Sequence, residues 1–434
     1  SHYKPYPAYR DSGVEWIGQV PEHWRVTPLK VIAETVNGAT PESGKPEYWD
    51  GDIAWYTPTD IDNEVASELG VPRRYITQAG YESCAVKISP PGSVILSTRA
   101  PIGSVGITTI PSTINQGCRT LIPAQDVPTS YLASTLVAAR EELRLRGNGT
   151  TFQELSTEAL RSLRVPIPPL SECVSIASGL DRETARFDAL IAKKTRFIEL
   201  LKEKRQALIT HAVTKGLNPK AKMKASGVEW IGEVPEHWVA IKFNHVARVT
   251  EGLVDPKAHP YREMVLIAPN HIESGTGKIL GLETAVFQNA ESGKYTCKKG
   301  AVIYSKIRPA LAKVAIAPCD CLCSADMYPM DCTDRTYPEW LFYLMLSPPF
   351  TSWAILESDR VAMPKINRES LADLRVFLPP MDEQLAAVAW LKAQVEKLEI
   401  VSLKTQHSID LLKERRAAFI TAAVTGQIDL RESA

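Results

Sequence analysis

Two long segments of the chain show the hydrophobic periodicity of coiled-coil helices. They cover residues 171–214 and 382–425 and contain almost no Pro or Gly. Apolar residues recur in alternating steps of three and four, which gives a narrow apolar seam and not a broad core face. The predicted seam consists of Leu180, Phe187, Ile191, Ile198, Leu201 and Leu208 in the first helix, and of Leu391, Val395, Leu398, Ile409, Leu412 and Phe419 in the second.

Boundary signals flank both segments. Pro168-Pro169 and Pro379-Pro380 end the elements that precede the helices, and Gly216 and Gly426 stand where C-caps are expected. Polar residues interrupt each seam, so we expect a short and imperfect coil. The interruptions are Thr184, Lys194 and Arg205 in the first helix, and Ser402, Thr405 and Arg416 in the second.

The rest of the chain alternates short apolar runs with turn residues. The runs at 93–96, 105–108 and 301–304 are rich in β-branched residues and bounded by turn residues, which predicts strands. Short helices are predicted at 131–145 and 338–346. The mixture is typical of α+β globular domains with long loops, where specific recognition usually sits.

The same order of segments occurs twice. Residues 12–24 (SGVEWIGQVPEHW) and 226–238 (SGVEWIGEVPEHW) differ at a single position. Residues 201–216 and 412–427, which lie 211 residues apart, share ten of sixteen residues. Chance does not produce identity of this length in this order, so the chain consists of two copies of one unit.

The duplication predicts how the two helices are used. A helix of ~44 residues is ~66 Å long, and its single apolar stripe needs a partner, which the second copy supplies. The simplest arrangement is an antiparallel coiled coil that separates two globular α/β domains in a pseudo-twofold repeat. The expected boundaries are 1–169 for the first domain, 170–216 for the first helix, 217–225 for a linker, 226–380 for the second domain, 381–427 for the second helix and 428–434 for a tail.

Composition excludes several classes of protein. Hydrophobic residues make up 44% and charged residues 23%, so wholesale disorder is excluded. Lys plus Arg (50) equals Asp plus Glu (50), which rules out a basic coat but leaves room for a local basic face. No apolar stretch reaches the ~18 residues of a membrane span, and no leader pattern is seen. Because the eight Cys are scattered, we expect a reducing, cytoplasmic location and no membrane partner.

The repeated motifs resemble those of a known family. The SGVEWIG…VPEHW openings, the LRVPIPPL and LRVFLPPM runs and the LKEKRQALI and LKERRAAFI helix ends are similar to the DNA-specificity subunit of Type I restriction-modification systems. The resemblance covers nearly the whole chain. It implies two target-recognition domains that each read half of a split double-stranded DNA site, and helices that set the gap and bind two methyltransferase subunits. It also implies a non-catalytic subunit that directs adenine methylation, and cleavage when restriction subunits join.

DNA reading requires particular side chains at particular spacings. Major-groove faces recur every ~34 Å along B-DNA, so two readers need a rigid spacer. Bases are read by Arg, Lys, Asn or Gln, and phosphate contacts set the register. The candidates are Arg73, Arg74, Tyr75, Lys87, Arg99, Asn115, Gln116 and Arg119 in the first domain, and Lys298, Lys299, Lys306, Arg308, Lys313 and Arg335 in the second.

Two of these candidates rank above the others. Arg99 and Arg308 each follow a strand-like run and lie beside a proline at a predicted loop. By contrast, the basic residues of the helices are expected on exposed faces or in partner contacts. They are Arg196, Lys202, Lys204, Arg205, Arg415 and Arg416. Because the two domains diverge while the helices match, we expect two different half-sites and an asymmetric target.

Enzyme motifs are incomplete in this sequence. Ser347-Pro348-Pro349-Phe350 resembles the base-gripping motif of amino-methyltransferases, but no methyl-donor loop accompanies it, so a helix-terminating turn is favoured. Residues 275–278 (GTGK) lack the upstream Gly of a phosphate-binding loop, and residues 147–149 (GNG) indicate a loop only. We therefore predict no catalytic residues and no cofactor.

Metal ligands are also not arranged as a metal site would require. The densest Cys group is Cys319, Cys321, Cys323 and Cys332, without C-x2-C pairs; the first three are expected on one face of a strand. His23 and His237 lie inside the repeated openings, where a packing or partner-contact role is favoured over catalysis. No metal site is predicted.

Two other functions stay open from the sequence alone. A scaffold that does not bind DNA could use the same coiled coil to carry two protein-binding domains. A stand-alone methyltransferase or nuclease would need a cofactor or metal site that the sequence does not display.

Overall fold

The computed structural model describes residues 3–61, 66–99, 101–147, 153–228, 231–358 and 364–431. The chain divides into two compact units, one made of Ser1–Lys194 with His407–Ala434 and the other of Thr195–Gln406. Each long helix contributes to both units. Within the described residues, every helix is either too short or too polar to cross a membrane.

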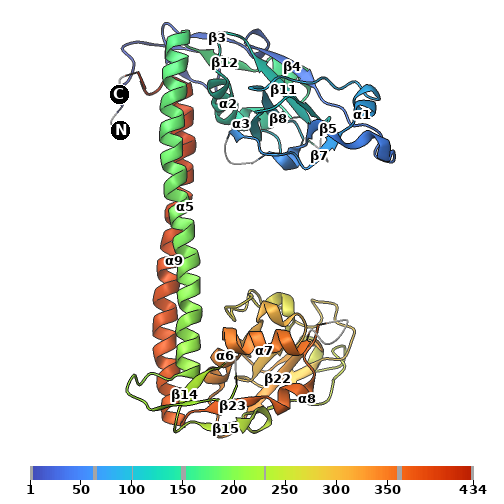
Figure 1. Ribbon diagram of the computed structural model, residues 1–434, viewed down its shortest axis with the longest axis vertical. Helices are drawn as coiled ribbons and strands as arrows, with labels where there is room; N and C mark the ends of the chain where they lie inside the picture. The colour runs from blue at the N-terminus through green and yellow to red at the C-terminus, as the bar shows by residue number, and fades with distance from the viewer. Residues whose placement is uncertain are drawn as a thin grey trace. The chain divides into compact units, whose positions relative to one another are not determined.

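The two long helices are α5 (Leu170–Thr214) and α9 (Met381–Val424), close to the predicted periodic segments (Figure 1). In the first unit the ring of Phe187 on α5 contacts that of Phe419 on α9, with centroids 6.2 Å apart. In the second unit Ile209 of α5 and Leu391 of α9 belong to one hydrophobic core. The start of α5 thus lies against the end of α9 in one unit, and the reverse holds in the other, so the pairing is antiparallel.

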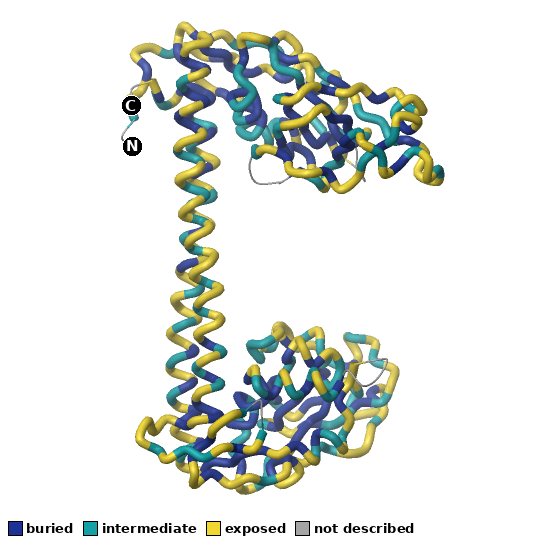
Figure 2. The backbone as a smooth tube through the Cα atoms, in the orientation of Figure 1, coloured by how far each residue is buried: buried dark blue, intermediate teal, exposed yellow. Residues whose placement is uncertain are grey.

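The helix positions expected in the seam are sheltered from solvent. All twelve are buried or half-buried, while other apolar residues of the same helices, such as Leu190 and Leu403, are exposed. Figure 2 shows buried helix positions mainly where the helices meet the globular parts. Gly216 and Gly426 have φ of 71° and 75°, the left-handed C-cap conformation that the sequence predicts.

Two arginines of the helices do not lie where the sequence places them. Arg205 and Arg416 were expected on exposed faces or in partner contacts, but only 9% and 6% of their surface is exposed. Arg416 pairs with Asp188 in the first unit, and Arg205 donates to loop carbonyls in the second. Both occupy seam positions, where a buried guanidinium needs internal acceptors.

The first unit is built on a five-stranded sheet of order β4-β11-β8-β9-β6. Its central strand β8 is buried at every position, and helix α2 packs on it through Leu132 and Leu136. A second sheet, of order β10-β5-β7, lies beside it. The elements are β4 (Ala33–Asn37), β5 (Trp49–Tyr56), β6 (Ser67–Glu68), β7 (Arg74–Ile76), α1 (Gln78–Glu82), β8 (Val94–Ser97), β9 (Val105–Ile107), β10 (Ser112–Ile114), β11 (Cys118–Pro123), α2 (Thr129–Ala138), α3 (Arg140–Leu145) and α4 (Thr157–Arg161).

The second unit repeats this order with two changes: its main sheet has four strands and not five, and its smaller sheet has a different central strand. Its main sheet runs β16-β22-β19-β20, and its smaller sheet runs β17-β21-β18. In the smaller sheet the late strand β21 is central, whereas in the first unit the early strand β5 is central. The elements are β16 (Ala247–Val249), β17 (Leu266–Ile267), β18 (Tyr295–Cys297), β19 (Val302–Ser305), β20 (Val314–Ile316), β21 (Cys321–Cys323), β22 (Met327–Cys332), α6 (Pro338–Leu346), α7 (Pro348–Ser358) and α8 (Arg368–Asp373).

Short strand pairs connect each globular part to the long helices. In each unit a hairpin carries the repeated opening, and a second pair joins the strand after the opening to the strand before a long helix. These are β1 (Tyr9–Asp11) with β2 (Gln19–Pro21), β3 (Arg25–Pro28) with β12 (Arg164–Ile167), β13 (Met223–Ala225) with β14 (Glu233–Pro235), and β15 (Val239–Lys242) with β23 (Arg375–Leu378).

The short predicted elements are confirmed with small shifts. The runs at 93–96, 105–108 and 301–304 form β8, β9 and β19. The helix expected at 131–145 is divided at Ala139 into α2 and α3, and the one at 338–346 is α6. The helix α7 that follows α6 was not expected, because the sequence places only a terminating turn there.

Candidate nucleic-acid interface

The repeated VPEHW motif holds the ends of the long helices. In the first unit Trp24 Nε1 donates to Oε2 of Glu172 in the first turn of α5 at 3.0 Å, and His23 Nε2 lies 2.8 Å from the other carboxylate oxygen. The Trp24 ring also packs against Gly426 at the end of α9, where a Cβ would approach Cη2 within 3.2 Å. The motif therefore joins the start of one helix to the end of the other.

The second unit repeats this arrangement with the helices exchanged. Trp238 Nε1 donates to Glu383 of α9 at 3.0 Å, His237 Nε2 lies 2.6 Å from the same carboxylate, and Gly216, just after the end of α5, packs against the Trp238 ring. The structural role expected for His23 and His237 agrees with these contacts. We call this repeated attachment of each globular part to the long helices the frame. It is the same in both copies, and the globular parts that it holds contain the DNA-binding candidates.

Three candidates of the first unit lie on β7 or next to it. Arg73 has its Nε 3.8 Å from Asp60, and Tyr75 packs against the core beside β5. Arg74 places its guanidinium carbon 3.5 Å from the centroid of the Trp49 ring. This strand is the edge of its sheet.

Arg99, Gln116 and Arg119 come together at the ends of β8 and β11. Arg99 pairs with Glu154 at 3.1 Å. Arg119 donates to the Gln116 carbonyl at 3.0 Å and to Thr157 of α4 at 2.9 Å. Burial lowers the pKa of the Arg119 guanidinium.

The remaining first-unit candidates are Asn115, which stabilises its own loop, and Lys87. Lys87 lies away from the corner formed by Arg99, Gln116 and Arg119. Asn115 uses its side-chain oxygen to accept a hydrogen bond from the Gly117 amide at 3.0 Å. Lys87 lies separately, 3.9 Å from Glu34. The first-unit candidates therefore occupy β7, the corner of Arg99, Gln116 and Arg119, and the isolated position of Lys87.

The equivalent corner of the second unit is also basic but is built differently. Lys306 lies over the Tyr328 ring at 5.2 Å, and Arg368 lies over the same ring at 5.5 Å. Arg368 also donates to the Tyr295 hydroxyl at 3.0 Å. The sequence alone did not identify Arg368 as a candidate. It lies in the first turn of a short helix, at the position that Thr157 occupies in the first copy, and this equivalence could have indicated it.

The guanidinium group at this corner belongs to a different structural element in each unit. Strand pairing with β8 and β19 makes Arg119 the equivalent of Tyr328, and the repeat makes Thr157 the equivalent of Arg368. The guanidinium comes from the strand in the first unit and from the helix in the second. The same frame thus presents two different surfaces at one corner.

The other second-unit candidates are dispersed. Lys298 pairs with Asp320 at 3.3 Å, and Lys313 donates to the Pro269 carbonyl at 2.5 Å. Arg308 is exposed and has a φ of 49°. Lys299 and Arg335 are also exposed.

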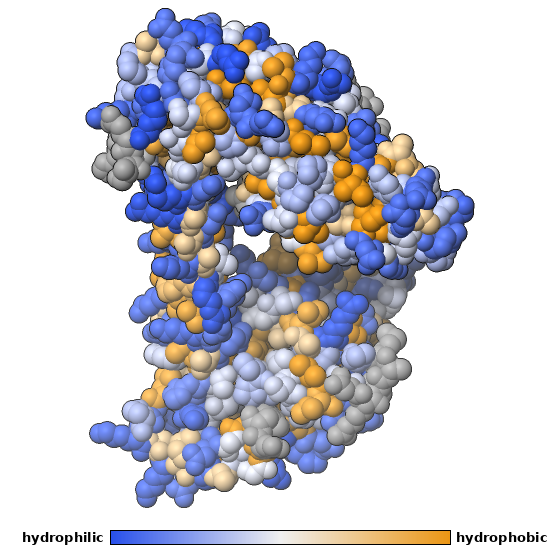
Figure 3. All heavy atoms as spheres, turned by 45° about the horizontal axis from the view of Figure 1, so that its top comes forward, coloured by the Kyte–Doolittle hydropathy of each residue, from blue (hydrophilic) through white to orange (hydrophobic). Residues whose placement is uncertain are grey.

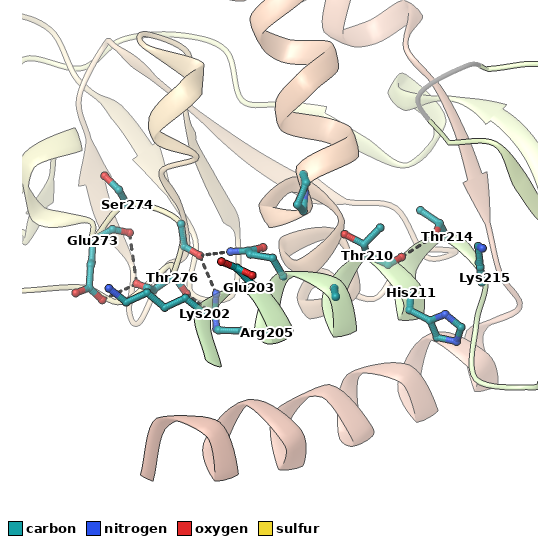
Figure 4. A pocket seen from close by; sticks show the side chains of 14 residues that line it. Lys202, Glu203, Arg205, Thr210, His211, Thr214, Lys215, Glu273, Ser274 and Thr276 are labelled. Carbon is teal, nitrogen blue, oxygen red and sulfur yellow. Dashed lines mark hydrogen bonds between the residues drawn. The ribbon is translucent and has the colours of Figure 1, made fainter. Parts of the chain in front are cut away.

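A groove of about 880 Å³ follows the last turns of α5 in the second unit (Figure 4). One wall is the loop at 273–276. Arg205 crosses to this wall and donates to the carbonyls of Gly275 and Thr276 at 2.7 and 3.0 Å, and Gln206 donates to Gly275 at 3.1 Å. Burial lowers the pKa of Arg205. The loop is therefore fastened to the helix by side-chain hydrogen bonds.

The long helices also expose apolar side chains outside the seam. In Figure 3 hydrophobic side chains lie between hydrophilic ones along the helices. They include Leu190, Phe197, Leu200, Ile400, Val401, Leu403 and Leu411. A solvated helix face is ordinarily polar, so apolar residues there indicate a surface for a partner.

The incomplete enzyme motifs have structural roles in the described residues. Ser347 ends α6, and its hydroxyl accepts from the Phe350 amide at the start of α7, so the expected helix-terminating turn is confirmed. The GTGK segment forms the wall that Arg205 binds. Of the GNG segment, residues 148 and 149 lie outside the described part.

The cysteines do not assemble a metal site in the part of the chain that the structure describes. No group of three or more His, Cys, Asp or Glu side chains there could hold an ion. Cys321 and Cys323 are buried in β21, but Cys319 lies before the strand and not on its face as expected.

Comparisons with known proteins agree on one family. A model described as "Type I restriction modification DNA specificity domain" matches residues 21–200 and 235–411. The chain is 29% identical over 371 residues to the Type I restriction enzyme EcoDI specificity subunit of Escherichia coli, covering 81% of this chain and 83% of that one. It is 27% identical over 428 residues to the MjaIX specificity subunit of Methanocaldococcus jannaschii, covering 96% of both.

Two solved structures share the fold. One is described as "Structural basis underlying complex assembly and conformational transition of the type I R-M system"; its TM-score is 0.64 at 16% identity, with 93% of this chain and 98% of that chain covered. The other is the crystal structure of the HsdS subunit from Thermoanaerobacter tengcongensis, with a TM-score of 0.50 at 16% identity and coverage of 94% and 98%.

Proposed function

Because the chain belongs to the Type I restriction modification DNA specificity family, we propose that it is the specificity subunit of a Type I restriction-modification complex. Each globular part is a target-recognition domain that reads one half of a bipartite double-stranded DNA site. The subunit is not itself catalytic. It directs adenine methylation by partner methyltransferase subunits, and cleavage when restriction subunits join the complex.

One observation carries this proposal: two copies of the same frame present different side chains at equivalent places. A shared frame fixes both readers to the helices in the same way, through the Trp–Glu contacts of the repeated motif. Base readout depends on the side chains at the groove. Since Arg119 and Thr157 of one copy are replaced by Tyr328 and Arg368 in the other, the two half-sites differ and the target is asymmetric.

The long helices serve as the spacer between the readers. We place the target-recognition domains at 1–169 and 226–380, the spacer helices at 170–216 and 381–427, the linker at 217–225 and the tail at 428–434. The twelve seam residues hold the helices together, and burial of Leu180, Leu391, Val395 and Ile409 supports this. A rigid spacer sets the gap between half-sites, because readers on one DNA face must be spaced near a helical turn or a multiple of it.

Two methyltransferase subunits bind along these helices. The exposed apolar residues of α5 and α9, among them Phe197 and Leu403, support such a contact, because apolar side chains gain from being covered by a partner. The groove beside Arg205 offers a concave part of the same surface. The complex acts on genomic DNA, which places it in the cytoplasm of a bacterial or archaeal cell.

The DNA-binding candidates divide according to whether their donors are already engaged. Arg119 and Lys313 donate to groups of the protein itself, so they support loops that face DNA. Arg74, Lys299, Arg308 and Arg335 are exposed, and these we propose as DNA contacts. Arg99, Lys87 and Lys298 lie beside carboxylates that DNA phosphates would replace.

Methylome mapping tests the proposal. A host that carries the methyltransferase subunit is sequenced with and without this chain, by a method that reports methyladenine at each base. We expect one bipartite, asymmetric motif with a fixed gap, methylated only when the chain is present. A methylome that does not change on removing the chain would contradict the proposal.

A salt titration separates it from the scaffold alternative. DNA binding that neutralises phosphates releases counterions, so the affinity of the complex must fall steeply as salt rises. A scaffold that binds only proteins would show no measurable DNA affinity at low salt. The control is the methyltransferase subunit alone, measured on the same duplex.

A further inference from the structure

Arg74 lies on a platform made by two tryptophans. Its guanidinium carbon is 3.5 Å from the centroid of the Trp49 ring and 6.0 Å from that of Trp55. At 3.5 Å the guanidinium must lie nearly parallel to the Trp49 ring, because standing on edge it would push a nitrogen into the ring. The cation is thereby held flat, and its N–H groups point outward along its own plane.

The platform itself is rigid. Trp49 and Trp55 are 6% and 5% exposed, and their rings meet edge to face with centroids 5.1 Å apart. Both indole N–H groups are satisfied: Trp49 donates to the Glu42 carbonyl at 3.3 Å, and Trp55 donates to the Ala39 carbonyl at 3.0 Å. Neither ring can turn without losing a hydrogen bond.

The backbone around the platform is shaped to bring these residues together. Trp55 lies directly opposite Arg74 in the pairing of β5 with β7, and a shift of register after Trp49 brings that ring in as well. Gly51 allows the shift, because a Cβ there would lie 2.6 Å from the Ile76 carbonyl oxygen. An arrangement that needs a bulge, a glycine and two buried tryptophans holds one side chain in a defined orientation.

Arg74 differs from the other basic candidates of its unit in having its donors available. Its neighbour Arg73 lies 3.8 Å from Asp60, Arg99 lies 3.1 Å from Glu154, and Arg119 donates to internal acceptors. In the part of the chain that the structure describes, no carboxylate pairs with Arg74, and the residue is exposed on an edge strand. A preorganised guanidinium with free N–H groups suits the two acceptors, O6 and N7, that guanine presents in the major groove.

We propose that Arg74, held flat by Trp49, reads a guanine in the half-site of the first target-recognition domain. The inference rests on the proposed function and deepens it by assigning one base to one side chain. It follows that loss of Arg74 changes sequence preference at one position, and not affinity for DNA in general.

The test uses the full chain in complex with its methyltransferase subunits and the target found by methylome mapping. Affinity is measured for duplexes in which each half-site position is changed in turn to the other three bases. We expect the wild type to prefer guanine, on one strand or the other, at a position of one half-site. In R74A and R74K this preference falls by about 10- to 100-fold, because lysine keeps the charge but not the paired donors. All other positions keep their preferences.

A control is R25A, which removes an exposed arginine of β3 in the same unit that is not among the DNA-binding candidates. It should leave every base preference unchanged. A merely structural role for Arg74 would lower affinity equally at all positions and would spare R74K, and this result would overturn the inference, as would unchanged preferences in R74A. If the wild-type complex itself preferred no sequence, the proposed function would fail first.

Discussion

Trp24 donates a hydrogen bond from its indole nitrogen to Oε2 of Glu172 at 3.0 Å, across 148 residues of sequence. The equivalent bond between Trp238 and Glu383 has the same length, 3.0 Å, in the second copy. This pair explains why the opening motif is repeated almost without change. The motif is part of the joint between each target-recognition domain and the helices, so it varies less than the surfaces that read DNA.

Removing the acceptor of this joint should destabilise the first unit more than the second. The Glu172 side chain is 9% exposed and that of Glu383 is 40% exposed. We expect Glu172→Ala to lower the free energy of unfolding by about 1.5–3 kcal/mol, because it leaves a buried indole N–H unpaired. The same change at Glu383 should cost less, since water can replace the carboxylate. Urea denaturation of both variants measures this, and E172Q, which keeps one acceptor, is the control; equal stability of E172A and wild type would contradict it.

Arg205 should control the mobility of the loop at 273–276. Lysine at this position cannot donate to the carbonyls of both Gly275 and Thr276 in the same geometry. We expect Arg205→Lys to speed amide hydrogen exchange in this loop by about tenfold or more, which mass spectrometry of loop peptides measures. The matched control is Arg416→Lys, whose arginine pairs with Asp188 in the other unit. If both variants exchanged alike in the loop, the contact would not be the one that holds it.

Substitution of a buried seam leucine of α9 should lower the stability of the fold, whereas substitution of an exposed leucine should weaken binding of the methyltransferase subunit. Leu391 is fully buried, and Leu391→Ala should lower the free energy of unfolding by about 2–5 kcal/mol. Leu403 is 72% exposed, so Leu403→Ala should change stability by less than about 0.5 kcal/mol. If the exposed apolar residues bind the methyltransferase subunit, L403A nevertheless weakens assembly in calorimetric titration. Normal assembly of L403A would remove this residue from the proposed contact surface.

Buried thiols should resist alkylation until the protein unfolds. Burial raises the pKa of Cys118 and Cys173 to about 12 in each case. A raised pKa means that the thiol stays protonated at pH 8, and only the thiolate reacts. We expect a maleimide to label Cys319 and Cys84, which are half-buried, before these two buried thiols. Mass spectrometry of peptides after timed labelling measures the order, and early labelling of Cys118 would contradict it.

Sequence periodicity and repeats were enough to place the frame. The seam spacing located both helices, and the glycines at 216 and 426 marked their ends, because these are local requirements of helix geometry. The identity of the two openings likewise predicted a shared frame. The repeated sequence could not identify Glu172 and Glu383 as the partners of the tryptophans, since those contacts join residues about 150 positions apart.

The arrangement of the reading surfaces depended on contacts that no local pattern reveals. Arg205 and Arg416 occupy the same place in the repeat, yet one binds a loop and the other a carboxylate. Trp49 lies under Arg74 only because the register of β5 against β7 shifts between Trp49 and Ile53. Residue types alone do not predict this shift. Arg368 was overlooked because its counterpart in the first copy is a threonine.

In the proposed function, two target-recognition domains read two half-sites at a set separation. The most direct measurement is the affinity of the complex for duplexes in which the gap between the half-sites grows one base pair at a time. We predict a single best gap, with clearly weaker binding one base pair to either side. Deleting a heptad from both helices, residues 195–201 and 403–409, should move the optimum to a shorter gap. Equal affinity at every gap length would mean that the helices do not hold the two domains at a set separation.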